Sequence, residues 1–140
     1  MANMLDKNIV YTLNTDGGSR GNPGNAATGV IIHDSNLDVV FEEGKYIGVA
    51  TNNVAEYKAL VRGLEVAVGL GISNLEVYMD SELIIKQMRG EYKVKDAILF
   101  GFFTTARELV SRFEKVSFIH VKREFNKDAD RLVNKALDFL

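Results

Sequence analysis

The chain has 140 residues, of which 46% are hydrophobic and 26% charged, a composition typical of one soluble globular domain. It contains no cysteine, which excludes disulfide bonds, zinc sites built on thiolates and cysteine nucleophiles. Its formal net charge is −2. Because most duplex-binding proteins carry a basic excess, charge by itself argues weakly against a nucleic-acid substrate.

The sequence also lacks signals for export or membrane insertion. The first seven residues have none of the apolar character of a signal peptide. No apolar run approaches the roughly 20 residues that a transmembrane helix needs. We therefore expect residues 1–140 to form a single cytoplasmic domain without membrane contact. We expect a monomer, because no large exposed apolar patch is indicated.

The first third of the chain favours strands joined by short turns. Its apolar, β-branched segments are separated by stretches rich in glycine, asparagine and aspartate, which predict turns. Asp16 opens the longest of these stretches, which runs to Gly24 and contains the only proline. Such an arrangement predicts an antiparallel meander. The expected strands cover residues 8–14, 27–33 and 37–47, with a hairpin turn at 34–36 and an irregularity at 42–44.

The rest of the chain alternates helices with strands. Tyr57, Leu60 and Leu64 recur at helical spacing, in a helix expected to begin near Asn52 and to end at residues 69–71. The order β-β-β-α-β-α-α-β-α predicts an α/β fold with helices packed against a partly parallel sheet. The later elements are expected as strands at 75–79 and 116–121 and helices at 81–88, 97–113 and 126–140.

Four acidic residues lie at the ends of these predicted elements. Asp16 and Asp80 each follow a strand. Glu56 lies near the start of a helix, and Asp130 lies early in the last helix. Taken singly, each fits a structural role as turn former, capping residue or partner of a helix dipole. Together they could converge at one edge of the sheet, where carboxylates suit hard divalent cations such as Mg²⁺.

Four segments around these carboxylates resemble the motifs of one enzyme family, the type 1 ribonucleases H. They are YTLNTDGGSRGNPG (11–24), TNNVAEYKAL (51–60), VYMDSELIIKQ (77–87) and VKREFNKDADRLVNKAL (121–137), in the order found in that family. The resemblance extends over residues 8–140. It implies a ribonuclease H-like fold: a five-stranded mixed sheet, with three antiparallel strands followed by two parallel ones, and helices on both faces.

The resemblance also implies a chemistry for the carboxylates. Asp16, Glu56, Asp80 and Asp130 fall on the family's catalytic and metal-binding positions, with Asp16 bridging two Mg²⁺ ions, for which Mn²⁺ could substitute. One ion would activate a water molecule and the other would stabilise the leaving oxygen. The implied activity is hydrolysis of the RNA strand of an RNA–DNA hybrid, leaving 5′-phosphate and 3′-hydroxyl ends.

Substrate contacts are expected beside these carboxylates. Asn22 and Asn53 match asparagines that contact the hybrid in the family, and nearby glycines would let the backbone approach a duplex. The same residues also fit plain turn and capping roles. The expected substrate-binding residues are Gly17, Gly18, Asn22, Thr51, Asn52 and Asn53, and the basic residues that could meet phosphates are Arg20, Lys86, Arg89, Lys93, Lys95, Lys122 and Arg123.

The chain departs from the family pattern in several places. Residues 88–97 are too few for the extra basic helix with which some members grip the hybrid, which predicts weak, salt-sensitive binding. His120 lies in an apolar run, so we expect a strand residue rather than a catalytic acid. Glu82 stands where relatives commonly carry an amide, and its effect stays open.

Three other interpretations stay open. The first is another nuclease of the same superfamily, such as a retroelement-like domain or an enzyme that cleaves double-stranded RNA, and a comparison of hybrid with duplex RNA would separate these. The second is a nucleic-acid-binding module without activity. The third is an unrelated α/β binding protein whose acidic residues only cap helices, and such a protein would gain no stability from divalent cations.

Overall fold

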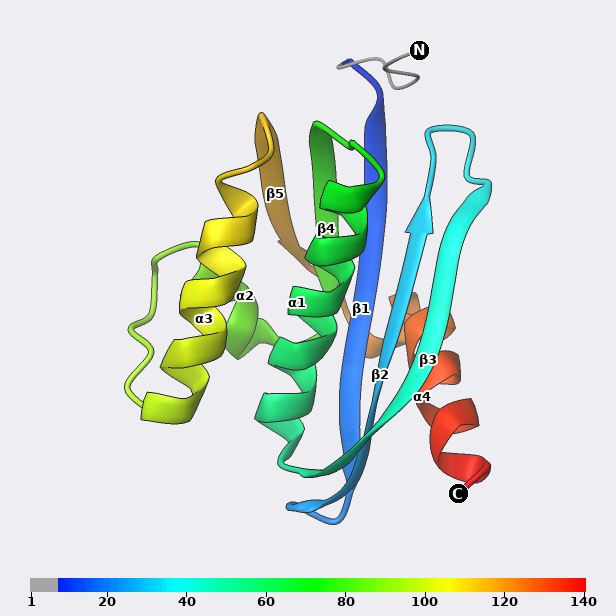
Figure 1. The fold of residues 1–140 in the computed structure, drawn as a ribbon, viewed down its shortest axis with the longest axis vertical. Helices are drawn as coiled ribbons and strands as arrows, with labels where there is room; N and C mark the ends of the chain where they lie inside the picture. The colour runs from blue at the N-terminus through cyan, green and yellow to red at the C-terminus, as the bar shows by residue number, and fades with distance from the viewer. Residues whose placement is uncertain (1–7) are drawn as a thin grey trace.

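The computed structural model describes residues 8–140, which form a sheet flanked by helices (Figure 1). Within that range five strands lie in the order β3-β2-β1-β4-β5. The pairs β1–β2 and β2–β3 are antiparallel, whereas β1–β4 and β4–β5 are parallel, which confirms the expected mixed sheet. The strands are β1 (Val10–Arg20), β2 (Gly24–His33), β3 (Val39–Ala50), β4 (Asn74–Met79) and β5 (Lys115–His120).

Helices cover both faces of the sheet, as expected. The described helices are α1 (Asn52–Gly69), α2 (Glu82–Met88), α3 (Ala97–Val110) and α4 (Lys127–Asp138), with a 3₁₀ turn, η1 (Arg123–Phe125), before α4. α1 and α3 lie on one face and α4 on the other (Figure 1). Leu60 of α1 belongs to the main hydrophobic core with Leu13 of β1, and Val133 of α4 packs with Ala27 of β2 in a second core. None of the helices in residues 8–140 is long and apolar enough to span a membrane.

β1 is longer than the sequence predicts. It continues through Asp16 to Arg20, and Asp16 pairs with Gly29 of β2. The prediction that Asp16 follows the strand is therefore wrong. The predicted turn at 16–24 is also too long, because the turn contains only the residues between Arg20 and Gly24. Glycine-rich sequence normally weakens a strand. Here the pairing with β2 extends to Arg20–Asn25 and overrides that preference.

Other boundaries also differ from the predictions. Residues 42–44 pair in regular register with β2, so no irregularity lies there. The register instead shifts between Ala26 and Ala27 and again between Ile32 and His33. α3 ends at Val110 rather than at residue 113, and α4 begins at Lys127 after the 3₁₀ turn. The hairpin turn at 34–36 is confirmed, and the Asp34 carboxylate accepts hydrogen bonds from the backbone N–H groups of residues 36 and 38.

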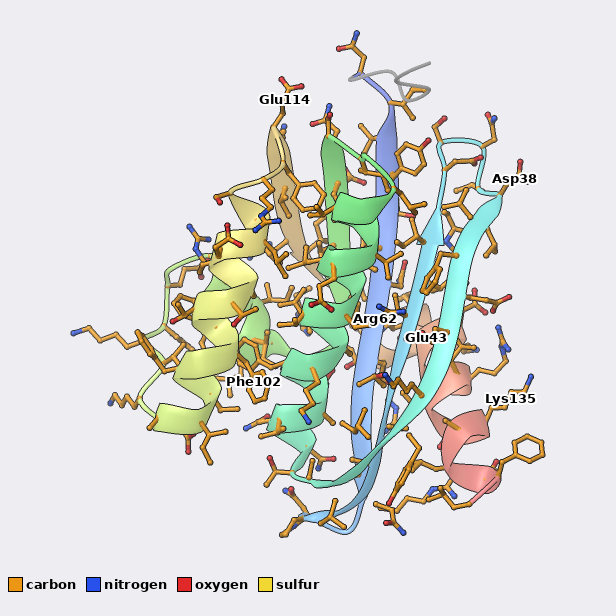
Figure 2. The ribbon with its side chains drawn as sticks, viewed as in Figure 1. Asp38, Glu43, Arg62, Phe102, Glu114 and Lys135 are labelled. Carbon is orange, nitrogen blue, oxygen red and sulfur yellow. The ribbon has the colours of Figure 1, made fainter. Side chains whose placement is uncertain are left out.

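An ion pair joins α1 to the edge of the sheet. Arg62 donates two hydrogen bonds of 3.0 Å to the two carboxylate oxygens of Glu43 on β3 (Figure 2). The Arg62 guanidinium also lies 5.8 Å from the centre of the Phe41 ring. Such a partly exposed pair stabilises a fold by about 1 kcal/mol at most. Glu43 therefore has a structural partner and takes no part in the acidic cluster described below.

Two glycines let α4 lie directly on the sheet. A Cβ atom at Gly29 would lie 2.2 Å from the carbonyl oxygen of Ala129, and one at Gly44 would lie 2.4 Å from that of Leu132. Real Cβ atoms do not approach backbone so closely, so these positions accept only hydrogen. Because Gly29 pairs with Asp16, this close approach also brings the start of α4 near the centre of β1.

We expect Gly29→Ala to destabilise the protein. The added methyl group would push α4 away from β2, and overpacking of this kind costs about 1–3 kcal/mol of unfolding free energy. The matched control is Gly101→Ala in α3, where a Cβ meets nothing within 4 Å. That change should raise the unfolding free energy by about 0.5–1 kcal/mol, because alanine favours helix. Urea unfolding measures both, and equal effects of the two substitutions would contradict this account of the packing.

Candidate active site

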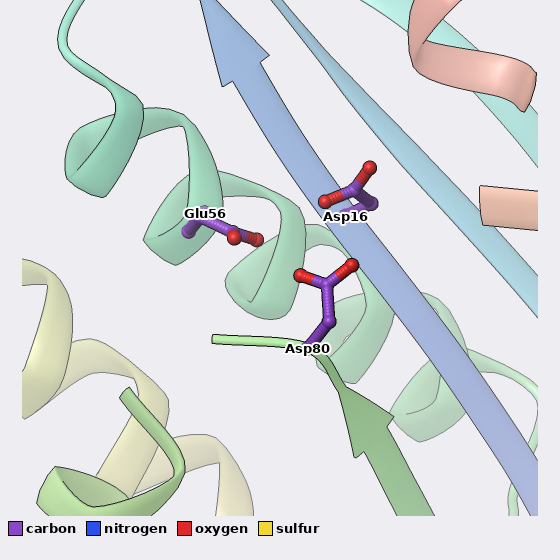
Figure 3. A group of neighbouring side chains, drawn as sticks. All are labelled: Asp16, Glu56 and Asp80. Carbon is purple, nitrogen blue, oxygen red and sulfur yellow. The ribbon is translucent and has the colours of Figure 1, made fainter. Parts of the chain in front are cut away.

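Three carboxylates converge at the centre of the sheet. Asp16 on β1, Glu56 on α1 and Asp80 just after β4 each offer an oxygen, and these oxygens lie within 4.8 Å of one another. In Figure 3 the three side chains point toward a common space. Asp16 and Glu56 are buried and Asp80 is half-buried. The convergence at one place that the sequence predicted is thus confirmed for these three residues.

Asp16 and Glu56 come close together because Gly17, the residue after Asp16, allows α1 to pack tightly against β1. Successive side chains of a strand point to opposite faces, so Gly17 faces α1 while Asp16 faces the other way. A Cβ at Gly17 would lie 2.2 Å from the backbone of Ala55, which means that α1 rests directly on β1. At this distance the Gly17 N–H donates a 3.0 Å hydrogen bond to Glu56 Oε1. The first turn of α1 is therefore fixed against the strand that carries Asp16.

Asp130 reaches the same place from the opposite face of the sheet. It lies in the first turn of α4 and lines, with the other three carboxylates, an open groove of about 500 Å³. It is not one of the three mutually close residues, so it stands at the side of the cluster. The structure thus brings all four predicted carboxylates to one groove, with three in close contact and one beside them.

Burial and mutual repulsion make this cluster hard to ionise. Burial raises the pKa of Asp16 to about 8, and the negative charges of Asp80 and Asp130 add to the effect. Burial also raises the pKa of Glu56 well above its ordinary value, and it raises the pKa of Asp80. Several buried carboxylates without a compensating cation disfavour their own charge. The site would therefore gain most from a bound positive ion.

One cationic side chain stands over the groove. Arg123, on η1, places its guanidinium 3.3 Å from an Asp130 carboxylate oxygen. Its charge lowers the pKa values of Asp16, Glu56 and Asp80, although burial outweighs it at each. The side chain is 78% exposed, so it can move without disturbing the core. Arg123 thus partly neutralises the cluster.

The predicted substrate-binding residues divide into two groups. Gly17, Gly18 and Asn52 line the groove. Thr51 caps α1, since its side-chain oxygen accepts a hydrogen bond from the Val54 N–H. Asn22 accepts a 3.0 Å hydrogen bond from the Asn52 N–H, which joins the β1–β2 turn to the start of α1. Thr51, Asn22 and Asn53 are exposed beside the groove but do not line it.

The structure bears on the expectations for Arg89 and His120 in different ways. Arg89 donates two hydrogen bonds to the Phe118 carbonyl oxygen, so it serves to join α2 to β5 rather than standing free for phosphate. His120 ends β5, which confirms the expected strand position, and the residue is exposed. It does not line the groove.

Asn126 is a residue of the site that the sequence reasoning missed. It is buried, and its side chain donates a 2.9 Å hydrogen bond to the Thr15 carbonyl oxygen, directly before Asp16. The sequence held one signal: Asn126 precedes Asp130 by four residues, which is one helical turn. By sequence alone Asn126 is predicted only as the first residue of the last helix.

The donor set fits a hard divalent cation. Every charged ligand atom that the described cluster offers is a carboxylate oxygen, the type that Mg²⁺ and Mn²⁺ accept, and no sulfur is available. Because burial raises the pKa values of Asp16 and Glu56, a cation bound among these carboxylates would favour their ionised forms. The groove is open to solvent, which leaves room for a substrate beside such an ion.

Comparisons with known proteins agree with this picture. A family described as "reverse transcriptase-like" matches residues 14–136. A bifunctional protein of Mycobacterium tuberculosis is 45% identical over 127 residues, which are 90% of this chain and 35% of the relative. Ribonuclease HI of Halobacterium salinarum is 45% identical over 123 residues, which are 88% of this chain and 62% of the relative. The chain thus spans about a third of the first relative and under two thirds of the second.

Solved structures match more completely. The crystal structure of the Halobacterium salinarum RNase H1 has a TM-score of 0.90 and 42% identity, and the match covers 94% of this chain and 99% of that one. LC11-RNase H1, solved in complex with an RNA/DNA hybrid, has a TM-score of 0.88 and 44% identity, covering 92% of this chain and 97% of that one. The fold, the cluster of carboxylates and the similarity to solved structures all lead to the same conclusion. The chain belongs to the type 1 ribonuclease H family.

Proposed function

We propose that this chain is an endonuclease that hydrolyses the RNA strand of RNA–DNA hybrids. The observation that carries the proposal is the convergence of Asp16, Glu56 and Asp80 within 4.8 Å, with Asp130 beside them in an open groove. A protein that is 44% identical over most of the chain was solved with an RNA/DNA hybrid bound, which supports the same substrate here. We take residues 1–140 as one catalytic domain acting as a monomer.

Two Mg²⁺ ions are the proposed cofactors, with Mn²⁺ as a substitute. Asp16, Glu56, Asp80 and Asp130 would hold them, because these are the carboxylates of the groove. When bound, the ions would lower the pKa of an attacking water and stabilise the charge on the leaving oxygen, giving 5′-phosphate and 3′-hydroxyl ends. We give Asp16 the central place, because it belongs to the close cluster and its strand lies between α1, which carries Glu56, and α4, which carries Asp130 (Figure 1).

The protein's own groups would prepare the site for this chemistry. Burial raises the pKa of Glu56, and the Gly17 N–H that donates to Glu56 Oε1 offsets part of this rise and holds the oxygen in place. Arg123 lines the groove beside Asp130, so its guanidinium could bind a substrate phosphate bidentately once cations occupy the carboxylates. Gly17 would thus help the carboxylates to hold cations, and Arg123 would orient the phosphate.

Recognition of the RNA strand would rest on the groove's small residues. A 2′-hydroxyl distinguishes RNA from DNA because it both donates and accepts hydrogen bonds. Gly18 leaves the backbone of β1 partly accessible at the groove, which Asn52 and the buried Gly17 also line. Asn22, Thr51 and Asn53 would contact the same strand from the exposed rim. The exposed Lys93 and Lys95 would meet phosphates more distantly.

A substrate comparison tests the proposed function. Equal concentrations of RNA–DNA hybrid, double-stranded RNA, single-stranded RNA and double-stranded DNA are incubated with the protein and Mg²⁺. We expect internal cleavage of the hybrid to be much faster than that of any other substrate, and we expect EDTA to abolish it. Preferential cleavage of double-stranded RNA would assign a different nuclease. Binding without cleavage in either Mg²⁺ or Mn²⁺ would assign a binding module.

A further inference from the structure

Asn126 occupies a helix-capping position without acting as a cap. It is the residue before the first turn of α4, a place where asparagine commonly accepts a hydrogen bond from the helix backbone. Here its side chain makes no such bond. Instead the side chain is only 1% exposed and points away from the helix end. A capping role therefore does not explain this residue.

The Asn126 amide is bonded to β1 beside Asp16. Its Nδ2 donates to the Thr15 carbonyl oxygen at 2.9 Å, and its Oδ1 accepts from the Asn14 side chain at 3.0 Å. The parallel ladder between β1 and β4 ends at the pair Asn14–Tyr78. The amide thus bonds β1 just beyond that ladder, immediately before Asp16.

Asn126 also lies next to two further carboxylates of the groove, Asp130 and Asp80. The Asp130 N–H donates a 3.1 Å hydrogen bond to the Asn126 carbonyl oxygen, which fixes the turn carrying Asp130. Burial raises the pKa of Asp80, and the Asn126 side chain lies close enough to that carboxyl to offset part of the rise. Asn126 therefore contacts the residue before Asp16, the Asp80 carboxyl and the backbone of Asp130.

We infer that Asn126 is a positioning residue, which sets the separation of Asp16, Asp80 and Asp130 so that they bind divalent cations together. The inference deepens the proposed function and rests on it. Partners that orient metal ligands typically affect metal affinity or activity by about 10- to 100-fold when they are removed. Asn126 has the geometry of such a partner, because it contacts the ligand-bearing segments while its side chain stays out of the groove lining.

Isothermal titration calorimetry with Mg²⁺, without nucleic acid, tests the inference. Asn126→Ala should weaken Mg²⁺ binding by about 10- to 100-fold, in line with other orienting partners. In the hybrid cleavage assay the same variant should lose kcat, with little change in KM at saturating Mg²⁺. Asn14→Ala removes only one bond of the amide, so it should weaken Mg²⁺ binding in the same direction but less. It provides the second variant if Asn126→Ala does not fold.

The matched control is Ile72→Ala, a buried position before β4, at the end of that strand away from Asp80. It should lower the melting temperature while leaving Mg²⁺ affinity and kcat at wild-type values. If both asparagine variants bind Mg²⁺ as tightly as Ile72→Ala does, the inference is overturned while the proposed function stands. If the wild-type protein itself binds no Mg²⁺ and cleaves no hybrid, the proposed function fails first.

Discussion

Asp16→Asn is expected to abolish hybrid cleavage while making the metal-free protein more stable. The loss of activity should reach about 1,000-fold or more. Asp16 would hold the cations, and these would stabilise the charge of the transition state by several kcal/mol. The stability should rise because burial and the neighbouring charges raise the pKa of Asp16 to about 8, so its ionised form is unfavourable in the fold. One pKa unit corresponds to about 1.4 kcal/mol, so the gain should be on the order of a few kcal/mol near pH 8 in EDTA.

Chemical unfolding in EDTA and the cleavage rate in Mg²⁺ measure the two effects on one variant. The control is Asp38→Asn, an exposed carboxylate near the β2–β3 hairpin, which should leave both quantities unchanged. If Asp16→Asn destabilised the metal-free protein, Asp16 would be an ordinary structural residue. If the variant kept its activity, the carboxylate would have no part in the chemistry.

The metal-free protein should lose stability as the pH rises, and Mg²⁺ should restore it. The pKa values of Asp16, Glu56 and Asp80 are raised, so between about pH 4 and pH 8 the folded state binds more protons than the unfolded state. Stability from these groups is thus fully present below their unfolded pKa values. It is lost as the pH rises through the folded value, about 8 for Asp16. A cation at 100 times its Kd adds about 2.7 kcal/mol.

Thermal unfolding at pH 5.5 and pH 8, with EDTA or Mg²⁺, checks this prediction. Protons compete with the cation for the carboxylates, so the Mg²⁺-induced rise in Tm should be larger at pH 8 than at pH 5.5. In Asp16→Asn both the pH dependence in EDTA and the Mg²⁺ effect should shrink. If the Tm were the same with and without Mg²⁺ at both pH values, the cluster would bind no cation.

The sequence predicted the order and pairing of the elements well. Periodicity distinguishes helices from strands, as it did for the helix containing Tyr57 and Leu60. Strand boundaries were weaker because they depend on partners elsewhere in the chain. Glycine near Asp16 indicates a turn by local preference, yet pairing with β2 carries β1 on to Arg20. Long-range hydrogen bonding of this type leaves no local signal.

The four carboxylates were predictable because each stands inside a recognisable motif. Their burial and spacing were not, since these depend on contacts that cross the sheet. Gly29 illustrates the difference: only the structure reveals that its missing side chain admits the Ala129 backbone, one residue before Asp130. Asn126 likewise has the sequence context of a helix cap, and only its bonds to β1 reveal another role.

Cleavage of a hybrid labelled on one strand at a time tests the central claim most directly. The proposed site predicts internal cuts in the labelled RNA strand with Mg²⁺, products ending in 5′-phosphate and 3′-hydroxyl, and an intact labelled DNA strand. EDTA and Asp16→Asn should each remove the cuts. Cleavage that persists in EDTA, or that falls on the DNA strand, would contradict the assignment of this carboxylate groove to metal-dependent hydrolysis of RNA.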